Sequence, residues 1–421
     1  MIVENEKLQE QRTLGQKLLN GQKLLSSDEL EKLGNPTFPL KSEKVEEYLG
    51  TIHHRLAMIT EEKRKKESVY RLVRIGLTSV LTVWIGLWEI QLFSDIQSLQ
   101  LRGAEIGLSL KTPPFPYTPQ QVGSMQYYVE KQEKLVPQAE IIKEQALQKG
   151  LIRLPIQIPY TTKQVNRWRK AINSFSMKRI PSGKVKVGSY YGNLDESPTF
   201  TAIVSKDMYV MDAEASQALY VAVMGRNPSS NRSLKVKCSS CPVTDISWFD
   251  SIKFANRLSK ISGLRPCYVI KDGVVSWPKG TSCKGFRLPT EAEWEDAARA
   301  QTETSYSGSD DHTRVGWFLG NSAQHLQDSR KLSSNDFGLY DLSGNVWEWC
   351  WDRYGSYSRG VYLDPIGNRK GGERGRRGGA FDSGSHTVSA RSGLDPREKN
   401  RSVGVRLVRT ISKGNLRESR E

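Results

Sequence analysis

The stretch GLYDLSGNVWEWCWD, residues 338–352, decides the fold of this chain. Trp347, Trp349 and Trp351 occupy every second position in it, so an extended backbone places all three indoles on one face. Indoles bury large areas, and each needs a partner for its N–H group. The pattern therefore predicts a core strand with an aromatic face.

Two further blocks of sequence flank this strand. GFRLPTEAEWEDAAR (285–299) precedes it, and RRGGAF (376–381) and GVRLV (404–408) follow it. In this order and spacing the blocks resemble the formylglycine-generating enzyme and sulfatase-modifying-factor family, whose fold is related to C-type lectins. The resemblance runs from about residue 177 to about residue 410. It implies an α+β, loop-rich domain of that fold over residues 176–411, followed by a tail at 412–421.

The composition narrows the classes of partner. The chain has 421 residues, a formal net charge of +16 and 37% hydrophobic residues, which is enough apolar material for a sizeable core. A basic balance favours an anionic partner. No basic run is interleaved with aromatic residues in the way that is typical of a nucleic-acid groove, so specific nucleic-acid binding is not expected.

The segment before this domain suggests an anchor and a spacer. Residues 1–70 read as a polar helical segment, and KRKK (63–66) leads into the apolar run at 75–93. With Glu89 and Gln91 accepted near its far end, this run predicts a transmembrane helix over 72–93; the alternative is a buried core helix. The excess of Lys and Arg before the run predicts a cytoplasmic N-terminus and a periplasmic or extracellular C-terminal domain. Residues 95–175, with the Pro-rich TPPFPYTP, are expected to form a spacer.

The resemblance does not carry the oxidase activity with it. In formylglycine-generating enzymes two cysteines after the RGGS-like motif bind copper and react with the substrate. Here residues 377–393 contain no cysteine, and Ser383 stands near the position of the first. A hydroxyl cannot replace a soft thiolate on copper, so neither copper nor formylglycine formation is expected. The iron-dependent relatives need clustered histidines, whereas His312, His325 and His386 of this domain are isolated in the sequence.

The resemblance does imply calcium. The family's calcium ligands map onto four positions of the tryptophan segment: Asp341, Gly344, Val346 and Glu348. Carboxylate and carbonyl oxygens suit this hard cation. The alternative is that Glu348 only hydrogen-bonds the turn.

The five cysteines all lie after residue 237. Cys267 and Cys283 bracket CYVIKDGVVSWPKGTSC, in which Asp272-Gly273 predicts a type I′ hairpin that would bring them together as a disulfide. Two others form a Cys238-Ser-Ser-Cys241 motif, which reads as a redox motif, half a zinc site or a local disulfide. The local disulfide is favoured because no second CxxC occurs and no helix start follows it.

The basic, Gly-rich stretch near the C-terminus is the candidate ligand site. In relatives, including the variable proteins of diversity-generating retroelements, the corresponding stretch faces the ligand. The predicted groove residues are Arg377, Ser383, His386, Arg391, Arg397 and Arg401. Guanidinium groups would bind an acidic peptide, a phosphate or sulfate group, or an anionic glycan. The alternative is a solvated charged rim.

Together these features predict a membrane-anchored, exported protein that binds, displays or scaffolds an anionic ligand, a peptide or an envelope protein. The rival prediction is a divergent oxidase or an accessory maturation enzyme of the same family.

Overall fold

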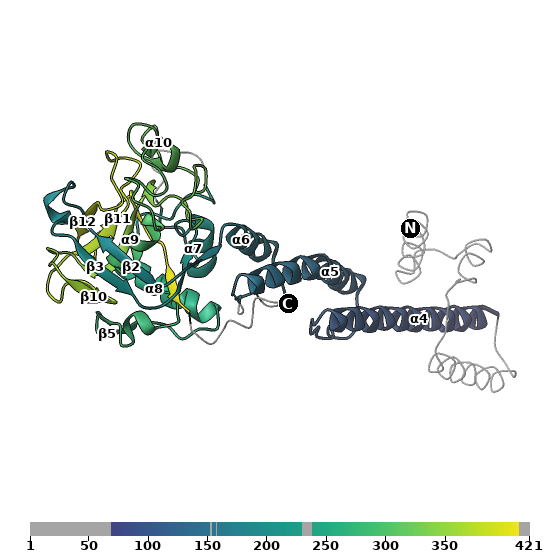
Figure 1. Cartoon of the computed structure of the whole chain (residues 1–421). Helices are drawn as coiled ribbons and strands as arrows, with labels where there is room; N and C mark the ends of the chain where they lie inside the picture. The colour runs from purple at the N-terminus through teal and green to yellow at the C-terminus, as the bar shows by residue number, and fades with distance from the viewer. Residues whose placement is uncertain (1–68, 152–153, 157, 230–237, 412–421) are drawn as a thin grey trace. The chain divides into compact units, whose positions relative to one another are not determined.

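The computed structural model describes residues 69–151, 154–156, 158–229 and 238–411, and the chain divides into two compact units (Figure 1). The units are Met1–Glu133 and Lys134–Glu421. The polar segment predicted at 1–70 lies, apart from its last two residues, outside the described residues, as does the whole tail at 412–421.

The described part of the first unit is built on one long helix, α4 (Val69–Glu105). The Phe93 ring lies 6.0 Å from that of Tyr117, and Arg102 pairs with Glu133 at 2.8 Å. Within the described residues, no helix has both the length and the apolar character needed to cross a membrane. The structure therefore does not support the transmembrane helix predicted over 72–93. The apolar run of the sequence is part of a longer helix that includes Glu89, Gln91 and Asp95.

The second unit begins inside helix α5 (Pro119–Gln148), which runs through Pro137 instead of ending there. Leu135, Ile142 and, from α6 (Thr162–Asn173), Trp168 are buried in the same hydrophobic cluster as the tryptophan strand. Residues 134–175, which the sequence assigned to a spacer, are thus part of this unit. The earlier boundary at 176 missed them because a helix packed on a domain has the same apolar spacing as a helix in a stalk.

The central sheet has the order β12-β11-β9-β13. It consists of β9 (Trp347–Arg353), β11 (Arg374–Arg377), β12 (Arg391–Leu394) and β13 (Val403–Gly404). Strand β9 is antiparallel to β11 and parallel to β13. Segments distant in the sequence therefore meet at the tryptophan strand, and β11 and β12 lie side by side in Figure 1.

Two further sheets and two small pairs complete the strands described. One sheet has the order β1-β4-β14, the other β10-β3-β2. Their strands are β1 (Met177–Ile180), β4 (Met208–Met211), β14 (Val408–Thr410), β10 (Val361–Leu363), β3 (Phe200–Val204) and β2 (Gly183–Val187). The small pairs are β5 (Val269–Lys271) with β6 (Val274–Ser276), and β7 (Gly316–Trp317) with β8 (Ser343–Gly344).

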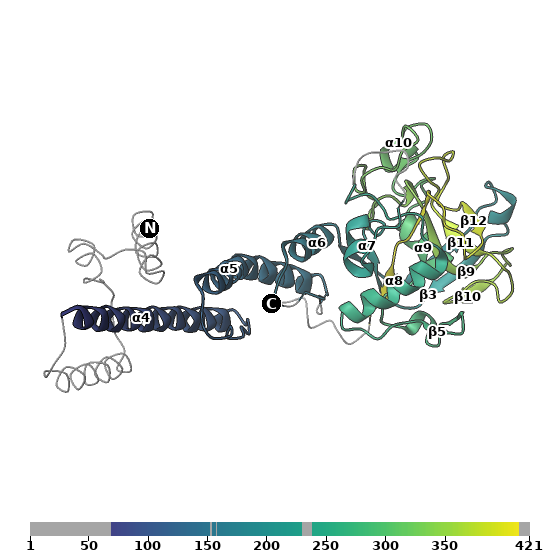
Figure 2. The same cartoon turned by 180° about the vertical axis from the view of Figure 1, so that it is seen from behind.

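Four α-helices follow α6 in this unit: α7 (Gln217–Met224), α8 (Trp248–Ile261), α9 (Glu291–Arg299) and the short α10 (His312–Val315) (Figure 2). Two 3₁₀ turns are present at η1 (Leu194–Glu196) and η2 (Gly280–Ser282). Capping boxes begin α8 at Ser247 and α9 at Thr290, where each hydroxyl accepts from the N3 backbone amide. The mixed, loop-rich α+β fold is confirmed with them.

The tryptophan strand is the core of this unit. Trp349 is fully buried and its indole donates to the Ile246 carbonyl at 3.0 Å, while Trp248 of α8 donates to the Cys350 carbonyl at 2.9 Å. The Trp351 ring lies 4.9 Å from that of Trp277. Trp349 has both the burial and the N–H partner that were predicted, Trp347 is buried and Trp351 is partly buried, and the predicted aromatic strand is confirmed.

Both predicted disulfides are present. Cys267 and Cys283 join at 2.07 Å, and Cys238 and Cys241 at 1.95 Å. Asp272 (φ 48°) and Gly273 (φ 76°) have the positive φ angles that a type I′ turn requires.

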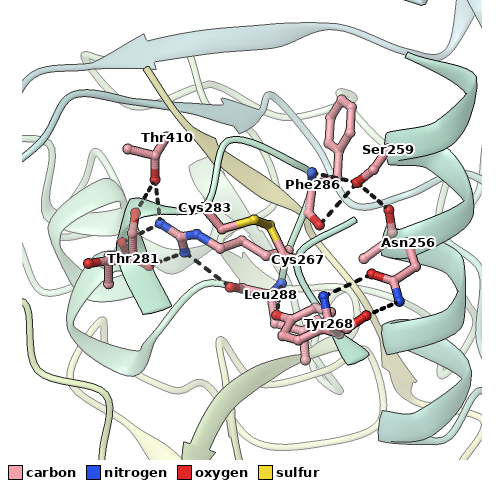
Figure 3. The surroundings of a disulfide bond; sticks show 12 residues. Asn256, Ser259, Cys267, Tyr268, Thr281, Cys283, Phe286, Leu288 and Thr410 are labelled. Carbon is pink, nitrogen blue, oxygen red and sulfur yellow. Dashed lines mark hydrogen bonds and ion pairs between the residues drawn. A yellow bond between two sulfur atoms is a disulfide. The ribbon is translucent and has the colours of Figure 1, made fainter. Parts of the chain in front are cut away.

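Hydrogen bonds surround the Cys267–Cys283 bridge, as Figure 3 shows. Ser259 Oγ accepts from the Phe286 amide at 2.8 Å, and the Tyr268 hydroxyl accepts from the Leu288 amide at 2.9 Å. This bridge is a brace between α8 and the segment that leads to α9.

Candidate functional site

Strand β11 has the sequence RGRR, and its arginines have different surroundings. Arg377 is fully buried and ion-paired to Glu295 at 2.5 Å and to Glu291 at 3.5 Å. Burial alone would lower the pKa of Arg377, but Glu295 and Glu291 hold it well above its ordinary value. Arg377 is thus committed to α9, and it does not contribute to a ligand surface as predicted.

Arg391 belongs to the same buried network. Its Nε lies 2.7 Å from Glu291, and its guanidinium lies 3.9 Å from the centre of the Tyr357 ring. It also borders a pocket of about 180 Å³, together with Asp352. Burial, and then the charge of Glu291, raise the pKa of Asp352 to about 8.

Arg374 and Arg376 lie against the tryptophans instead. The Arg374 guanidinium is 3.9 Å from the centre of the Trp248 ring, and that of Arg376 is 4.9 Å from the centre of the Trp347 ring. Neither arginine forms an ion pair with the residues that the structure describes. Burial lowers the pKa of Arg376 and lowers that of Arg374 to about 10.

Arg376 is the less satisfied of the two guanidinium groups. Its Nε is buried without a hydrogen-bond partner, and its Nη2 donates to Ser392 at a long 3.3 Å. A partly buried cation without an ion-pair partner loses hydration that one long hydrogen bond and an indole contact restore only in part. Arg376 is therefore ready to accept an anion.

His386 lies beside this arginine. Its ring is 4.9 Å from that of Trp347. Burial lowers the pKa of His386, and the charge of Arg376 lowers it further, so the imidazole is neutral at pH 7. We call Trp347, Arg376 and His386 the Trp347 face.

The two glycines of the RGG motif permit this arrangement. Gly378 and Gly379 have φ angles of 97° and 79°, which favour glycine. A Cβ at position 379 would lie 2.7 Å from His386 Cδ2 and 3.0 Å from the Phe318 ring. The motif therefore lets the histidine approach the backbone closely.

The remaining predicted groove residues divide between this face and the rim. Ser383 closes a turn, accepting from the Ala380 amide and donating to the Ala380 carbonyl, both at 3.0 Å. Arg401 pairs with Asp382 at 3.1 Å in the same loop region. Arg397 is an exposed rim residue that pairs with Asp395 at 4.0 Å. The groove predicted from the sequence left out Arg376, and no local feature of RGRR distinguishes it from Arg377.

Glu348 does not fit the predicted calcium site. Its carboxylate is fully buried and accepts from Arg406 Nη2 at 2.8 Å and Nε at 3.0 Å, and from the Trp294 indole at 2.7 Å. A calcium ion would have to break this buried ion pair, which costs several kcal/mol. The four residues therefore do not fit the ion as a set, and calcium stays a prediction.

Two other buried carboxylate oxygens in this region have no hydrogen-bond partner. Asp341 Oδ2 accepts from the Arg330 amide at 2.8 Å, but its Oδ1 is buried without a partner, as is Glu214 Oε1. Burial raises the pKa of Asp341 to about 6, and burial together with the charge of Asp341 raises the pKa of Glu214. Gly344 donates its amide to the Gly378 carbonyl, and Val346 is a core residue. No feature of the sequence predicted that Glu214 belongs to this region.

Comparison with known proteins assigns the second unit. Residues 164–411, more than half of the chain, match the family model described as sulfatase-modifying factor enzyme 1-like domain. The chain belongs to this family. It is 30% identical to the chaperone protein LppX of Paenibacillus barcinonensis, over 36% of this chain and 64% of the relative. It is 29% identical to a formylglycine-generating enzyme of Streptomyces coelicolor, over 49% of this chain and 65% of the enzyme.

A solved structure supports the same assignment. Treponema denticola variable protein 1 aligns with a TM-score of 0.51 and 29% identity, covering 56% of this chain and 95% of that protein. The chain spans just under two thirds of the two curated relatives named above. Within this sulfatase-modifying-factor-like domain, the sequence has no cysteine after Cys350.

Proposed function

We propose that this sulfatase-modifying-factor-like domain is a binding module that holds an acidic segment of a protein partner on the Trp347 face. The observation that carries the proposal is Arg376, a desolvated guanidinium with a buried, unpartnered Nε and an indole beneath it. A carboxylate from a partner would supply the missing charge and hydrogen bonds. Such charge-assisted bonds contribute about 1.5–3 kcal/mol.

The neighbours of Arg376 suit a peptide rather than a reaction. Neutral His386 offers one hydrogen bond, and the largely buried Trp347 ring supports both His386 and Arg376. Copper oxidase chemistry needs thiolate ligands, and the buried Cys350, whose pKa burial raises, is a poor source of one. The resemblance to the variable proteins, which use the corresponding stretch for binding, and the relative named as a chaperone favour a protein partner.

The two disulfides favour an oxidising compartment for this module. We therefore propose that the domain works outside the cytoplasm. In that setting it would hold an acidic segment of an exported protein.

A direct test is fluorescence anisotropy of a labelled peptide of alternating Asp and Glu, titrated with the full chain. A Gln and Asn peptide of the same length is the uncharged control. We expect Arg376→Gln to weaken binding of the acidic peptide about tenfold or more, which corresponds to about 1.4 kcal/mol. Arg397→Gln, on the exposed rim, should weaken it less than about twofold.

Equal binding of the two peptides would exclude recognition of charge. Unchanged affinity in the Arg376→Gln variant, with wild-type affinity also in Arg397→Gln, would remove the Trp347 face as the site.

A further inference from the structure

A second cluster of reactive side chains lies away from the residues of the Trp347 face. Cys238 and Cys241 come from the loop between α7 and α8, and Asp328 comes from a loop about 90 residues later. The Asp328 Oδ1 atom is 2.9 Å from Cys238 Sγ and 3.7 Å from Cys241 Sγ. All three candidate ligand atoms lie within 4.8 Å of one another.

Backbone contacts hold this loop in place. The Gln217 amide donates to the Cys241 carbonyl at 2.9 Å, and the Ala218 amide donates to the Ser239 carbonyl at 3.0 Å. Both donors lie in the first turn of α7, which is itself packed in the core. The two sulfur atoms are thus presented by a fixed backbone.

The Ser240 hydroxyl donates to Asp328 Oδ1 at 2.5 Å and helps to hold the carboxylate at this loop, but the disulfide itself does not explain why Oδ1 lies so close to the sulfur. A disulfide sulfur has no proton to donate, so the lone pairs of Asp328 face the lone pairs of Cys238 without a hydrogen between them. The same carboxylate would accept a hydrogen bond from a thiol, or it would share a cation with two thiolates. The geometry therefore suits the reduced pair better than the oxidised one.

The Asp328 carboxylate also distinguishes between the two roles that a reduced CxxC pair can have, which are nucleophilic chemistry and metal binding. A nucleophilic cysteine needs a lowered pKa, which neighbouring cations or helix N-termini provide. Asp328 is an anion, and it opposes ionisation of both thiols. A divalent cation reverses this effect, because two thiolates and a carboxylate all stabilise it together.

We propose that Cys238, Cys241 and Asp328 form a zinc site when the disulfide is reduced. A dithiol reductant transfers two electrons and two protons to the bridge and becomes a disulfide itself. Zinc then displaces the two thiol protons into solvent and binds both sulfurs and the Asp328 carboxylate. Three protein ligands leave a fourth tetrahedral position for water. Thiolates select zinc over calcium or magnesium.

Exposure makes the site switchable. Cys241 is 5% exposed, but Cys238 is half-buried and Ser240 is exposed, so a reductant can reach this bridge from the Cys238 side. Cys267 and Cys283 are 3% and 5% exposed, and their bridge serves as an internal control that mild reduction should leave closed.

The test begins with the full chain, oxidised or mildly reduced with a phosphine that is then removed. Thiols are counted, zinc is added and excess is removed, and bound zinc is measured by mass spectrometry. We expect one zinc per chain after reduction and none before it. Cobalt in place of zinc should give thiolate-to-metal charge-transfer absorption together with the visible bands of a tetrahedral ion.

Matched variants complete the test. Cys238→Ser with Cys241→Ser should abolish zinc binding, and Asp328→Asn should weaken it about tenfold or more. Cys350→Ser, which alters a buried thiol outside the cluster, should retain it. Melting of the oxidised Asp328→Asn chain checks that this variant folds. The proposal is overturned if a chain with two new thiols binds no zinc, or if the double serine variant still binds it.

Discussion

Arg376 and Arg377 are neighbours on one strand, yet they face opposite environments. Arg377 is enclosed by Glu291 and Glu295 of α9, whereas Arg376 lies on Trp347 without a carboxylate in ion-pair contact among the described residues. In a strand, adjacent side chains point to opposite faces, so one strand can serve the core and a binding face together. The contrast teaches that residue type alone does not identify a binding arginine; its counter-charges do.

The largest expected effect comes from breaking the paired side. Arg377→Gln leaves the carboxylates of Glu291 and Glu295 buried with one cation fewer, and we expect it to lower the free energy of unfolding by about 3–5 kcal/mol. Arg376→Gln should change it by about 1 kcal/mol or less, because no ion pair is lost. Denaturation of the full-length variants in urea measures both.

A double variant sharpens this result. Glu295→Gln added to Arg377→Gln removes the carboxylate that lost its Arg377 partner and kept only Arg299, at 2.7 Å, so the two changes should be non-additive by about 0.5–3 kcal/mol. Equal destabilisation by Arg376→Gln and Arg377→Gln would contradict the division of roles on β11.

The difference between Arg376 and Arg377 also shows which features could be predicted from the sequence and which could not. The spacing of Trp347, Trp349 and Trp351 and the Asp272-Gly273 turn are local signals, and the strand and the hairpin disulfide followed from them. The partners of the charged residues are not local. Glu291 and Glu295 lie about 80 residues before Arg377, and nothing in RGRR shows which arginine they meet.

Two predictions neglected contacts between residues far apart in the sequence. The calcium prediction treated Glu348 as a free ligand, but Arg406, 58 residues later, occupies its carboxylate. The spacer prediction separated α6 from the domain, but Trp168 is buried with residues of α8 and β9. Periodicity predicts which face of an element is buried, and only the fold shows against what.

The carboxyl group of Asp352, close to the Glu291 partner of Arg377, leads us to predict that the free energy of unfolding depends on pH. Asp352, buried beside Glu291, has a pKa of about 8, against about 3.9 in an unfolded chain. Between these values the folded state keeps a proton that the unfolded state has released, so this residue makes stability fall as pH rises from about 4 to about 8. One proton corresponds to a slope of about 1.4 kcal/mol per pH unit.

Asp352→Asn should remove that contribution, since the amide oxygen can still accept from the Glu291 amide. The difference in unfolding free energy between variant and wild type should grow in favour of the variant from pH 5 to pH 8. Asp395→Asn, at an exposed carboxyl, is the control. Parallel stability curves for wild type and Asp352→Asn would show that Asp352 is ionised in the folded chain.

The variant with the smallest expected effect tests the Trp347 face by changing a glycine of the backbone beside it. Gly379→Ala adds a methyl group 2.7 Å from His386 Cδ2 at a φ of 79°, whereas Gly384→Ala, five residues on, meets no atom within 4 Å. We expect Gly379→Ala to cost about 1 kcal/mol of stability and Gly384→Ala about 0.5 kcal/mol or less. Acidic-peptide affinity should fall a few-fold in the first variant only, because the displaced imidazole no longer lies beside Arg376. If Gly379→Ala loses stability but keeps full affinity, His386 only packs against Trp347 and the anion is held by Arg376 alone.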